Sequence, residues 1–100
     1  MSTVTNKSSY KQIIIDEDKV IFLGYQLILT KTEYSILKAL IESADTPLLP
    51  DEICAKIGIE LSNKNISFHI SNVNKKAKII SNRNLVKKFA KNGYFLNEEM

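Results

Sequence analysis

The chain has 100 residues, of which 44% are hydrophobic and 25% are charged, and its net charge is +3. This length suits one domain with one hydrophobic core, and the mixture of apolar and charged residues is that of a folded protein, which excludes wholesale disorder. No run approaches the roughly 20 apolar residues of a membrane-spanning helix; the single cysteine excludes an internal disulfide, and with one histidine it excludes most zinc sites.

The first residues of the chain are polar and show no periodicity. Residues 1–10 are rich in Ser and Thr and lack the apolar stretch of a secretory signal. We therefore predict a flexible tail over residues 1–10, followed by one domain over residues 11–97. With neither a signal nor a membrane span, the chain is expected to be cytoplasmic. A domain of this size more often binds a partner than turns over a substrate.

Three short runs rich in β-branched and aromatic residues come next, and they predict a small antiparallel sheet. The acidic turn Asp16–Asp18 and Gly24 separate these runs. The acidic residues are interpreted as a solvated turn, because they lack the spaced ligands of a calcium loop. The three predicted strands are Gln12–Ile15, Val20–Leu23 and Tyr25–Leu29.

Local signals mark the limits of the first two helices. Thr30 and Glu33 have the spacing of a capping box, in which Glu33 reaches back to the amide of Thr30. A second helix is expected to begin near Pro50 and to stop at Gly58. Cys54 within it is interpreted as a small buried hydrophobe and not as a reactive thiol. The apolar stripe of the first helix is predicted to consist of Tyr34, Leu37, Ala39, Leu40 and Ile41.

The third helix is predicted to begin after Ser62, a good N-cap residue, and to extend to about Lys78. One face is a continuous apolar stripe with the spacing of a core-facing helix. Its members are Ile66, Ile70, Val73, Ala77 and Ile80. The opposite face mixes cations, hydroxyl groups, an amide and one aromatic ring, without an acidic side chain. It is formed by Lys64, Phe68, Ser71 and Lys75, flanked by Ser67, Asn72 and Lys78.

Charge is distributed unevenly, and the third helix lies in the basic part of the chain. Residues 1–60 hold six lysines and nine acidic residues, whereas residues 61–97 hold eight cations and no acidic residue. The basic part also holds eight of the nine asparagines, whose amides can bond to base edges or phosphates. Such a one-sided segment attracts polyanions. The alternative is a surface that only keeps the protein soluble.

Two strands, Leu85–Phe89 and Tyr94–Leu96, are predicted to form a hairpin through the turn Ala90–Gly93. The order of elements predicts an α+β fold: a winged helix-turn-helix with a small N-terminal antiparallel sheet, three helices and a C-terminal β-hairpin wing. A helix about 10–12 Å across fits the major groove of DNA. Three lysines of the hairpin can lie along the neighbouring backbone or minor groove: Lys87, Lys88 and Lys91.

Three blocks of sequence resemble the OmpR/PhoB-type winged-helix effector domains. The block LTKTEYSILKAL (Leu29–Leu40) is similar to the start of the family's first helix. NISFHISNVNKK (Asn65–Lys76) resembles its recognition helix, and VKKFAKNGYFL (Val86–Leu96) resembles its wing, including Gly93 and Tyr94. The resemblance covers about residues 11–97 and extends to the N-terminal domains of ToxR-like regulators. It implies a transcription regulator that binds double-stranded DNA sequence-specifically, with no cofactor, small-molecule substrate or enzymatic activity.

The resemblance also implies further partners. Family members bind tandem sites in pairs, so a homodimer on DNA is expected. They can also contact RNA polymerase through the segment between the second and third helices, and that segment, Gly58–Leu61, is short here. A receiver domain does not fit within this length, so the N-terminal aspartates are not interpreted as phosphorylation sites. A related architecture would make the module the cytoplasmic part of a longer, membrane-anchored regulator.

The third helix and the wing supply the predicted DNA contacts. Lys64 and Lys75 are expected to anchor phosphates, and Asn72 to pair with adenine through its amide. Phe68 is interpreted either as a contact to a thymine methyl group or as packing under the wing or in a dimer. His69 is either a phosphate contact or a semi-buried histidine. The full predicted set is Lys64, Asn65, Ser67, Phe68, His69, Ser71, Asn72, Lys75, Lys78, Lys87, Lys88 and Lys91.

The sequence departs from the family pattern at several contact positions. Val73 and Asn74 stand where the family usually has Leu-Arg, Asn72 where it often has Arg, and Ala90 where it often has a wing arginine. Affinity is therefore expected to depend on lysine–phosphate contacts and to fall steeply with salt. The main alternative is a winged helix that binds an acidic protein. A nuclease is disfavoured, because no carboxylate cluster, nucleophile–histidine motif or Gly-rich phosphate loop is present.

Overall fold

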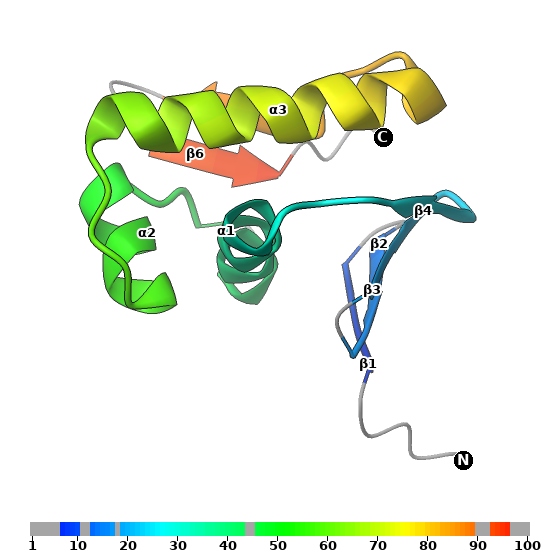
Figure 1. Cartoon of the computed structure of the whole chain (residues 1–100), viewed down its shortest axis with the longest axis horizontal. Coiled ribbons are helices and arrows are strands. Elements are labelled where there is room, and N and C mark those ends of the chain that lie inside the picture. The colour runs from blue at the N-terminus through cyan, green and yellow to red at the C-terminus, as the bar shows by residue number, and fades with distance from the viewer. Residues whose placement is uncertain (1–6, 11–12, 18, 44–45, 90–92, 97–100) are drawn as a thin grey trace.

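A computed structural model describes residues 7–10, 13–17, 19–43, 46–89 and 93–96 of the chain. It contains an N-terminal sheet, three helices and a C-terminal hairpin, as the sequence predicts (Figure 1). None of the helices in these ranges is long and apolar enough to cross a membrane. The elements are β1 (Lys7–Tyr10), β2 (Ile13–Asp16), β3 (Lys19–Phe22), β4 (Tyr25–Leu27), α1 (Lys31–Glu42), α2 (Pro50–Ile57), α3 (Asn63–Ser81), β5 (Val86–Phe89) and β6 (Gly93–Leu96).

The N-terminal sheet is an antiparallel meander in the order β1-β2-β3-β4. Ile15 pairs with Val20 and Phe22 pairs with Tyr25. Along β2 and β3 burial alternates, because successive side chains of a strand point to opposite faces. The inward face contributes Ile13, Ile15, Val20 and Phe22 to the core.

Strand β1 corrects one prediction. Residues 1–10 were expected to form a flexible tail, but Lys7–Tyr10 pair with β2, from Lys7 opposite Asp16 to Tyr10 opposite Ile13. Strand pairing uses backbone N–H and C=O groups, which every residue here supplies, so a polar segment without hydrophobic alternation can still add to a sheet edge. Residues 1–6 of the predicted tail lie outside the described residues.

Helix α1 begins at the predicted capping box. The Thr30 hydroxyl accepts a hydrogen bond from the Glu33 amide at 3.2 Å, and Glu33 Oε1 accepts one from the Thr30 amide at 3.0 Å. Both amides would otherwise lack partners at the helix start. The buried stripe of α1 includes Ile36, which the sequence analysis did not assign to the core, whereas Tyr34 is only half-buried.

Helices α2 and α3 also end and begin where the local signals predict. Gly58 follows α2 with φ of 75°, and its amide donates to the Cys54 carbonyl at 2.9 Å. Cys54 is half-buried, and its sulfur lies 3.4 Å from both the amide nitrogen and the carbonyl oxygen of Leu61. The Ser62 hydroxyl caps α3 by accepting from the Asn65 amide at 3.1 Å.

Substitution of Gly58 tests the cost of its left-handed conformation. Gly58→Ala is expected to lower the free energy of unfolding by about 1 kcal/mol, because a Cβ is strained at this φ. Beyond its two chain neighbours, no atom of the described residues lies within 4 Å of the added carbon, so the loss comes from the backbone conformation and not from a clash with another part of the protein. Gly58→Asn should cost less, since asparagine tolerates this region. Urea unfolding of the three proteins measures both values, and equal losses for the two variants would contradict the prediction.

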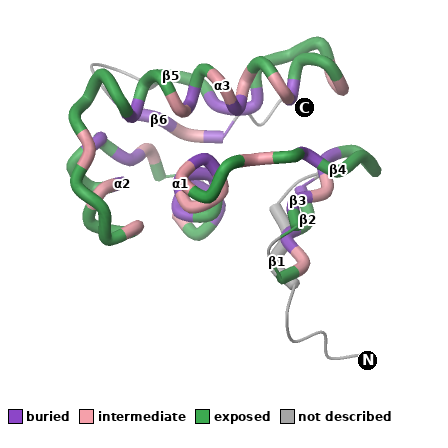
Figure 2. Tube along the Cα trace, in the orientation of Figure 1, coloured by how far each residue is buried: buried purple, intermediate pink, exposed green. Residues whose placement is uncertain are grey.

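The C-terminal hairpin is joined to the helical part of the protein through strand β6. In the hairpin Val86 pairs with Leu96 and Lys88 with Tyr94. Tyr94 also forms an isolated bridge with Leu48, with N···O distances of 2.9 and 2.8 Å. Residues 90–92 of the predicted turn lie outside the described residues. Figure 2 shows that buried residues gather where α1, α3 and β6 face one another, which places the hairpin against the core.

Candidate nucleic-acid interface

An open groove runs between α3 and β5. Its α3 side presents Ser67, Ser71, Lys75 and Lys78, and its β5 side presents Lys87 and Lys88. None of the residues that line it in the described ranges is acidic. Two consecutive elements of the chain therefore bring hydroxyl groups and cations to one surface, which gives it a positive field.

The pattern of α3 explains why these side chains face the groove. Ile66, Ile70, Val73 and Ala77 are buried at spacings of four, three and four residues, so they hold one side of the helix against the core. The groove-lining positions lie one residue further along the chain for most of these. A helical residue rotates about 100° from its neighbour, and this rotation carries Ser67, Ser71 and Lys78 out of the core to solvent. Lys75, two residues after Val73, is also exposed.

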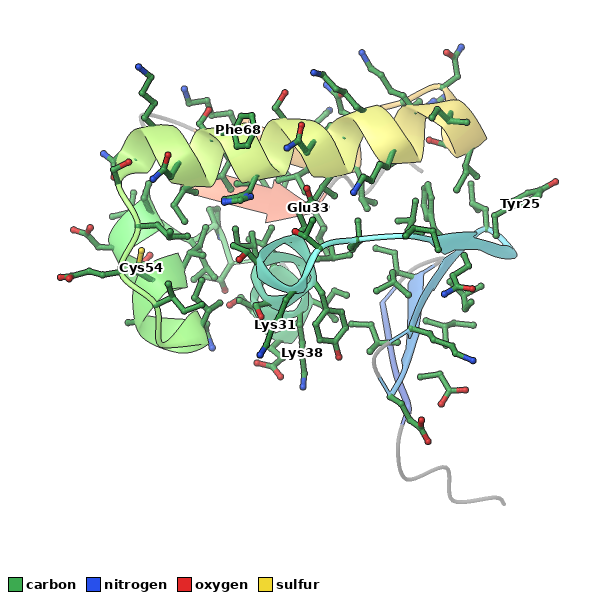
Figure 3. The ribbon with its side chains drawn as sticks, viewed as in Figure 1. Tyr25, Lys31, Glu33, Lys38, Cys54 and Phe68 are labelled. Carbon is green, nitrogen blue, oxygen red and sulfur yellow. The ribbon has the colours of Figure 1, made fainter. Side chains whose placement is uncertain are left out.

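The structure exposes most of the predicted contact residues but gathers only some of them in the groove. Lys64, Asn65 and Phe68 are exposed elsewhere on α3, and Asn72 is half-buried. Phe68 is 59% exposed (Figure 3), so its outward orientation is confirmed. Lys91 lies outside the described residues. The predicted residues that line the groove are Ser67, Ser71, Lys75, Lys78, Lys87 and Lys88.

His69 is half-buried and contacts Phe68 edge to face, with ring centroids 5.5 Å apart. Its Nδ1 atom is buried and has no hydrogen-bond partner among the residues that the structure describes. His69 therefore packs beside Phe68 on α3 and is not among the described residues that line the groove.

An ion pair behind the groove joins α3 to α1. Glu33, which is only 2% exposed, lies between the two helices (Figure 3), and its Oε1 accepts a hydrogen bond from Lys76 Nζ at 2.7 Å. Burial raises the pKa of the Glu33 carboxyl, but the bonds from Lys76 and Thr30 and the charges of Lys76 and His69 outweigh it and lower the pKa below its ordinary value. Glu33 is therefore ionised at neutral pH.

Asn74 is a site residue that the sequence analysis did not identify. It was noted only as a neutral replacement for a family arginine, yet its Oδ1 accepts hydrogen bonds from the amides of Leu85 and Val86 at 2.9 and 2.8 Å. Its Nδ2 donates to the Val86 carbonyl at 3.0 Å. One signal was present in the sequence: Asn74 lies four residues after Ile70 and three before Ala77, at the margin of the buried stripe.

Comparison with known proteins identifies solved structures with a similar fold. No protein-family model and no curated protein sequence matches the chain. Among solved structures, the response regulator AdeR DNA-binding domain, in complex with an intercistronic region, has a TM-score of 0.80 and 24% identity over 90% of this chain and 98% of that one. The Klebsiella pneumoniae RstA DNA-binding domain, in complex with the RstA box, has a TM-score of 0.75 and 18% identity over 92% and 97% of the two chains.

A third similar structure links the fold to a longer protein. The Thermotoga maritima response regulator DrrB, described as an OmpR/PhoB homolog, has a TM-score of 0.74 and 21% identity over 92% of this chain. The match spans 44% of the DrrB chain. The resemblance inferred from the three sequence blocks is therefore confirmed in three dimensions: this chain has the fold of the OmpR/PhoB-type winged-helix effector domains.

Proposed function

We propose that the protein is a transcription regulator that binds double-stranded DNA sequence-specifically, with α3 in the major groove and the β5–β6 wing against an adjacent groove. The observation that carries this proposal is the groove between α3 and β5, where lysines from both elements meet and no acidic side chain of the described residues lines the surface. Phosphate contacts from two elements fix the orientation of a protein on a duplex. The similar domains of AdeR and RstA were solved in complex with DNA, which supports the same activity here.

The proposal assigns different roles to the exposed side chains. Lys75 and Lys78 of α3 and Lys88 of β5 would bind phosphates. Asn72 would read a base edge, since its amide matches the N6 and N7 atoms of adenine. Phe68 would contact a thymine methyl group, which accounts for an aromatic ring left 59% exposed. The remaining proposed contacts are Lys64, Asn65, Ser67, His69, Ser71, Lys87 and Lys91.

Two protein partners and a location accompany this function. A single winged helix reads few base pairs, so a second copy on a tandem site would supply further specificity. RNA polymerase would be contacted from the segment between α2 and α3, where Ile59 is 43% exposed beside Glu60. A DNA-binding role requires this chain to lie in the cytoplasm, where it can reach the chromosome.

Fluorescence anisotropy tests the function directly. Duplexes selected from a random pool should bind at least about tenfold more tightly than the pool, with affinity falling steeply between roughly 50 and 200 mM salt. Salt-dependent binding without a preferred sequence would contradict specific recognition. Binding of an acidic protein in place of DNA would establish the alternative function, an interaction module that uses the same basic face.

The variant Asn72→Ala separates base reading from phosphate binding. We expect binding to the selected duplex to weaken by about 1–3 kcal/mol, as when a bidentate pair with a base is removed, and little change on the pool. Lys75→Ala should weaken binding to both by the same factor, because phosphates carry no sequence. Anisotropy titrations of the two variants against both duplexes give the comparison. A uniform loss for Asn72→Ala would remove its role in base reading.

A further inference from the structure

The side chain of Asn74 pairs with the backbone of β5 as another strand would. The Val86 N–H donates to Asn74 Oδ1 at 2.8 Å, and the Val86 carbonyl accepts from Asn74 Nδ2 at 3.0 Å. The Leu85 N–H also donates to Asn74 Oδ1, at 2.9 Å. In an antiparallel pair a residue exchanges both bonds with its partner strand, and a primary amide offers the same donor and acceptor. Asn74 therefore occupies the outer edge of β5, whose other edge pairs with β6.

This amide lies between the two rows of cations. Asn74 is half-buried and lines the groove, with Lys75 and Lys78 on its own helix and Lys87 and Lys88 on the strand that it holds. Lys87 and Lys88 follow Val86 directly, so any shift of Val86 relative to α3 moves the wing lysines relative to the helix lysines. Three hydrogen bonds to one rigid amide fix that separation.

Asn74 itself has little left to offer a ligand. Its Oδ1 already accepts two hydrogen bonds, which occupy both of its lone pairs, and its Nδ2 already donates one of its two hydrogens. A direct contact to a base edge through the whole amide would require these bonds to break. The nearby groups that can reach a phosphate are lysines, and Lys75, Lys78 and Lys88 are exposed.

We infer that Asn74 is a positioning residue, which sets the distance between α3 and the wing so that both rows of lysines meet phosphates of one duplex together. This inference rests on the proposed DNA-binding function and extends it to the shape of the ligand. A rigid separation selects duplexes whose backbone strands match it, which is recognition of groove geometry and not of base edges.

The test combines amide exchange with a double-mutant cycle. In the free protein, Asn74→Ala should abolish the hydrogen-exchange protection of the Leu85 and Val86 amides, while the Tyr94 amide, bonded to Leu48, keeps its protection.

On the selected duplex, Asn74→Ala should weaken binding about tenfold. It should also lower the slope of log affinity against log salt by about 0.9 for each wing lysine that no longer reaches a phosphate. The change Lys88→Ala should then lower the affinity for the selected duplex about eightfold in the parent protein but less than twofold in the Asn74→Ala background.

Two further variants make the result specific. Asn63→Ala removes an exposed amide at the start of α3, outside the groove, and should leave affinity and salt slope unchanged. Asn74→Gln keeps the side-chain amide but lengthens the side chain by one methylene. The variant therefore keeps a polar group at this position while it shifts the amide relative to β5. In Asn74→Gln, as in Asn74→Ala, the further change Lys88→Ala should weaken DNA binding by less than twofold. If Asn74 touched DNA directly, the longer glutamine side chain could still reach the DNA, and Asn74→Gln would keep its affinity.

The outcomes are distinguishable. Retained protection of Leu85 and Val86 in Asn74→Ala, or a loss from Lys88→Ala that is the same in both backgrounds, would overturn the positioning role while leaving DNA binding intact. No binding of any duplex by the parent protein would overturn the proposed function and this role with it. Additive losses together with retained affinity in Asn74→Gln would reassign Asn74 as a direct contact.

Discussion

Replacing Lys75, Lys78 and Lys88 together with alanine is expected to weaken binding to the selected duplex by about 10²- to 10³-fold in roughly 0.1 M salt. Each lysine–phosphate contact releases about 0.9 counterion, which at this salt is equivalent to about 1.2 kcal/mol. Three contacts therefore account for about 3–4 kcal/mol. The salt slope should fall by about 2.7 at the same time, and anisotropy titrations at several salt concentrations measure both quantities.

The chain offers a matched control for this triple variant. Lys31, Lys38 and Lys56 are also exposed, and Figure 3 shows Lys31 and Lys38 on the side of α1 that points away from α3. Changing these three to alanine brings the net charge from +3 to zero, as the groove variant does. The control should change affinity less than about threefold, because distant exposed charges are screened beyond about 10 Å. Equal losses in the two triple variants would mean that net charge alone attracts DNA.

The second large effect concerns stability. Glu33→Ala is expected to lower the free energy of unfolding by about 2–4 kcal/mol, since it removes a buried ion-pair partner and the second half of the capping box. Lys76 is left behind, but its side chain is 35% exposed and can be hydrated, which keeps the loss below that of a fully buried pair. Glu33→Gln retains the shape and an acceptor for the Thr30 amide, so about 1–2 kcal/mol is expected. Urea unfolding at pH 7 gives both values.

The same ion pair predicts a dependence on pH. The pKa of Glu33 is lower in the folded protein than in the unfolded chain, so its contribution is fully present above the unfolded-state pKa and is lost as the pH falls through the folded-state pKa. The stability difference between the parent and Glu33→Gln should therefore be constant from pH 6 to 8 and shrink in acid. A difference that stayed constant to pH 3 would show that the charge of Glu33 contributes nothing.

The elements that sequence analysis placed well are those with local chemical signals. The capping box at Thr30, the N-cap at Ser62 and the glycine at Gly58 each act within four residues of chain, so their spacing alone identifies them. The core stripe of α3 is local in the same sense. These signals were sufficient to predict the order of helices and the hairpin, and with them the winged-helix fold.

The features that sequence analysis missed depend on pairing with a second element and have no local signal of their own. Strand β1 forms through backbone pairing with β2 and carries no hydrophobic alternation in Lys7–Tyr10. The bond between Glu33 and Lys76 joins residues 43 positions apart, and nothing at either position indicates its partner. The three bonds of Asn74 require α3 and β5 to be already in place. The predicted set of DNA-binding residues therefore stays a prediction, and the sequence alone could not separate the lysines that line the groove from others on α3.

The anchors of the hairpin have a consequence for how the protein folds. Within the N-terminal sheet, β1, β2 and β3 each pair with the next strand in the chain, so this sheet closes only short loops and can assemble early. The wing instead depends on Leu48 for β6, a contact between distant parts of the chain that exists only after the helices have docked, and on Asn74 for β5, a contact that requires α3 to be formed. Because long-range contacts form late, the hairpin should dock in the last folding step. A partly folded chain would therefore display the lysines of α3 without the wing beside them, and it would hold polyanions loosely and without discrimination until that final strand closes.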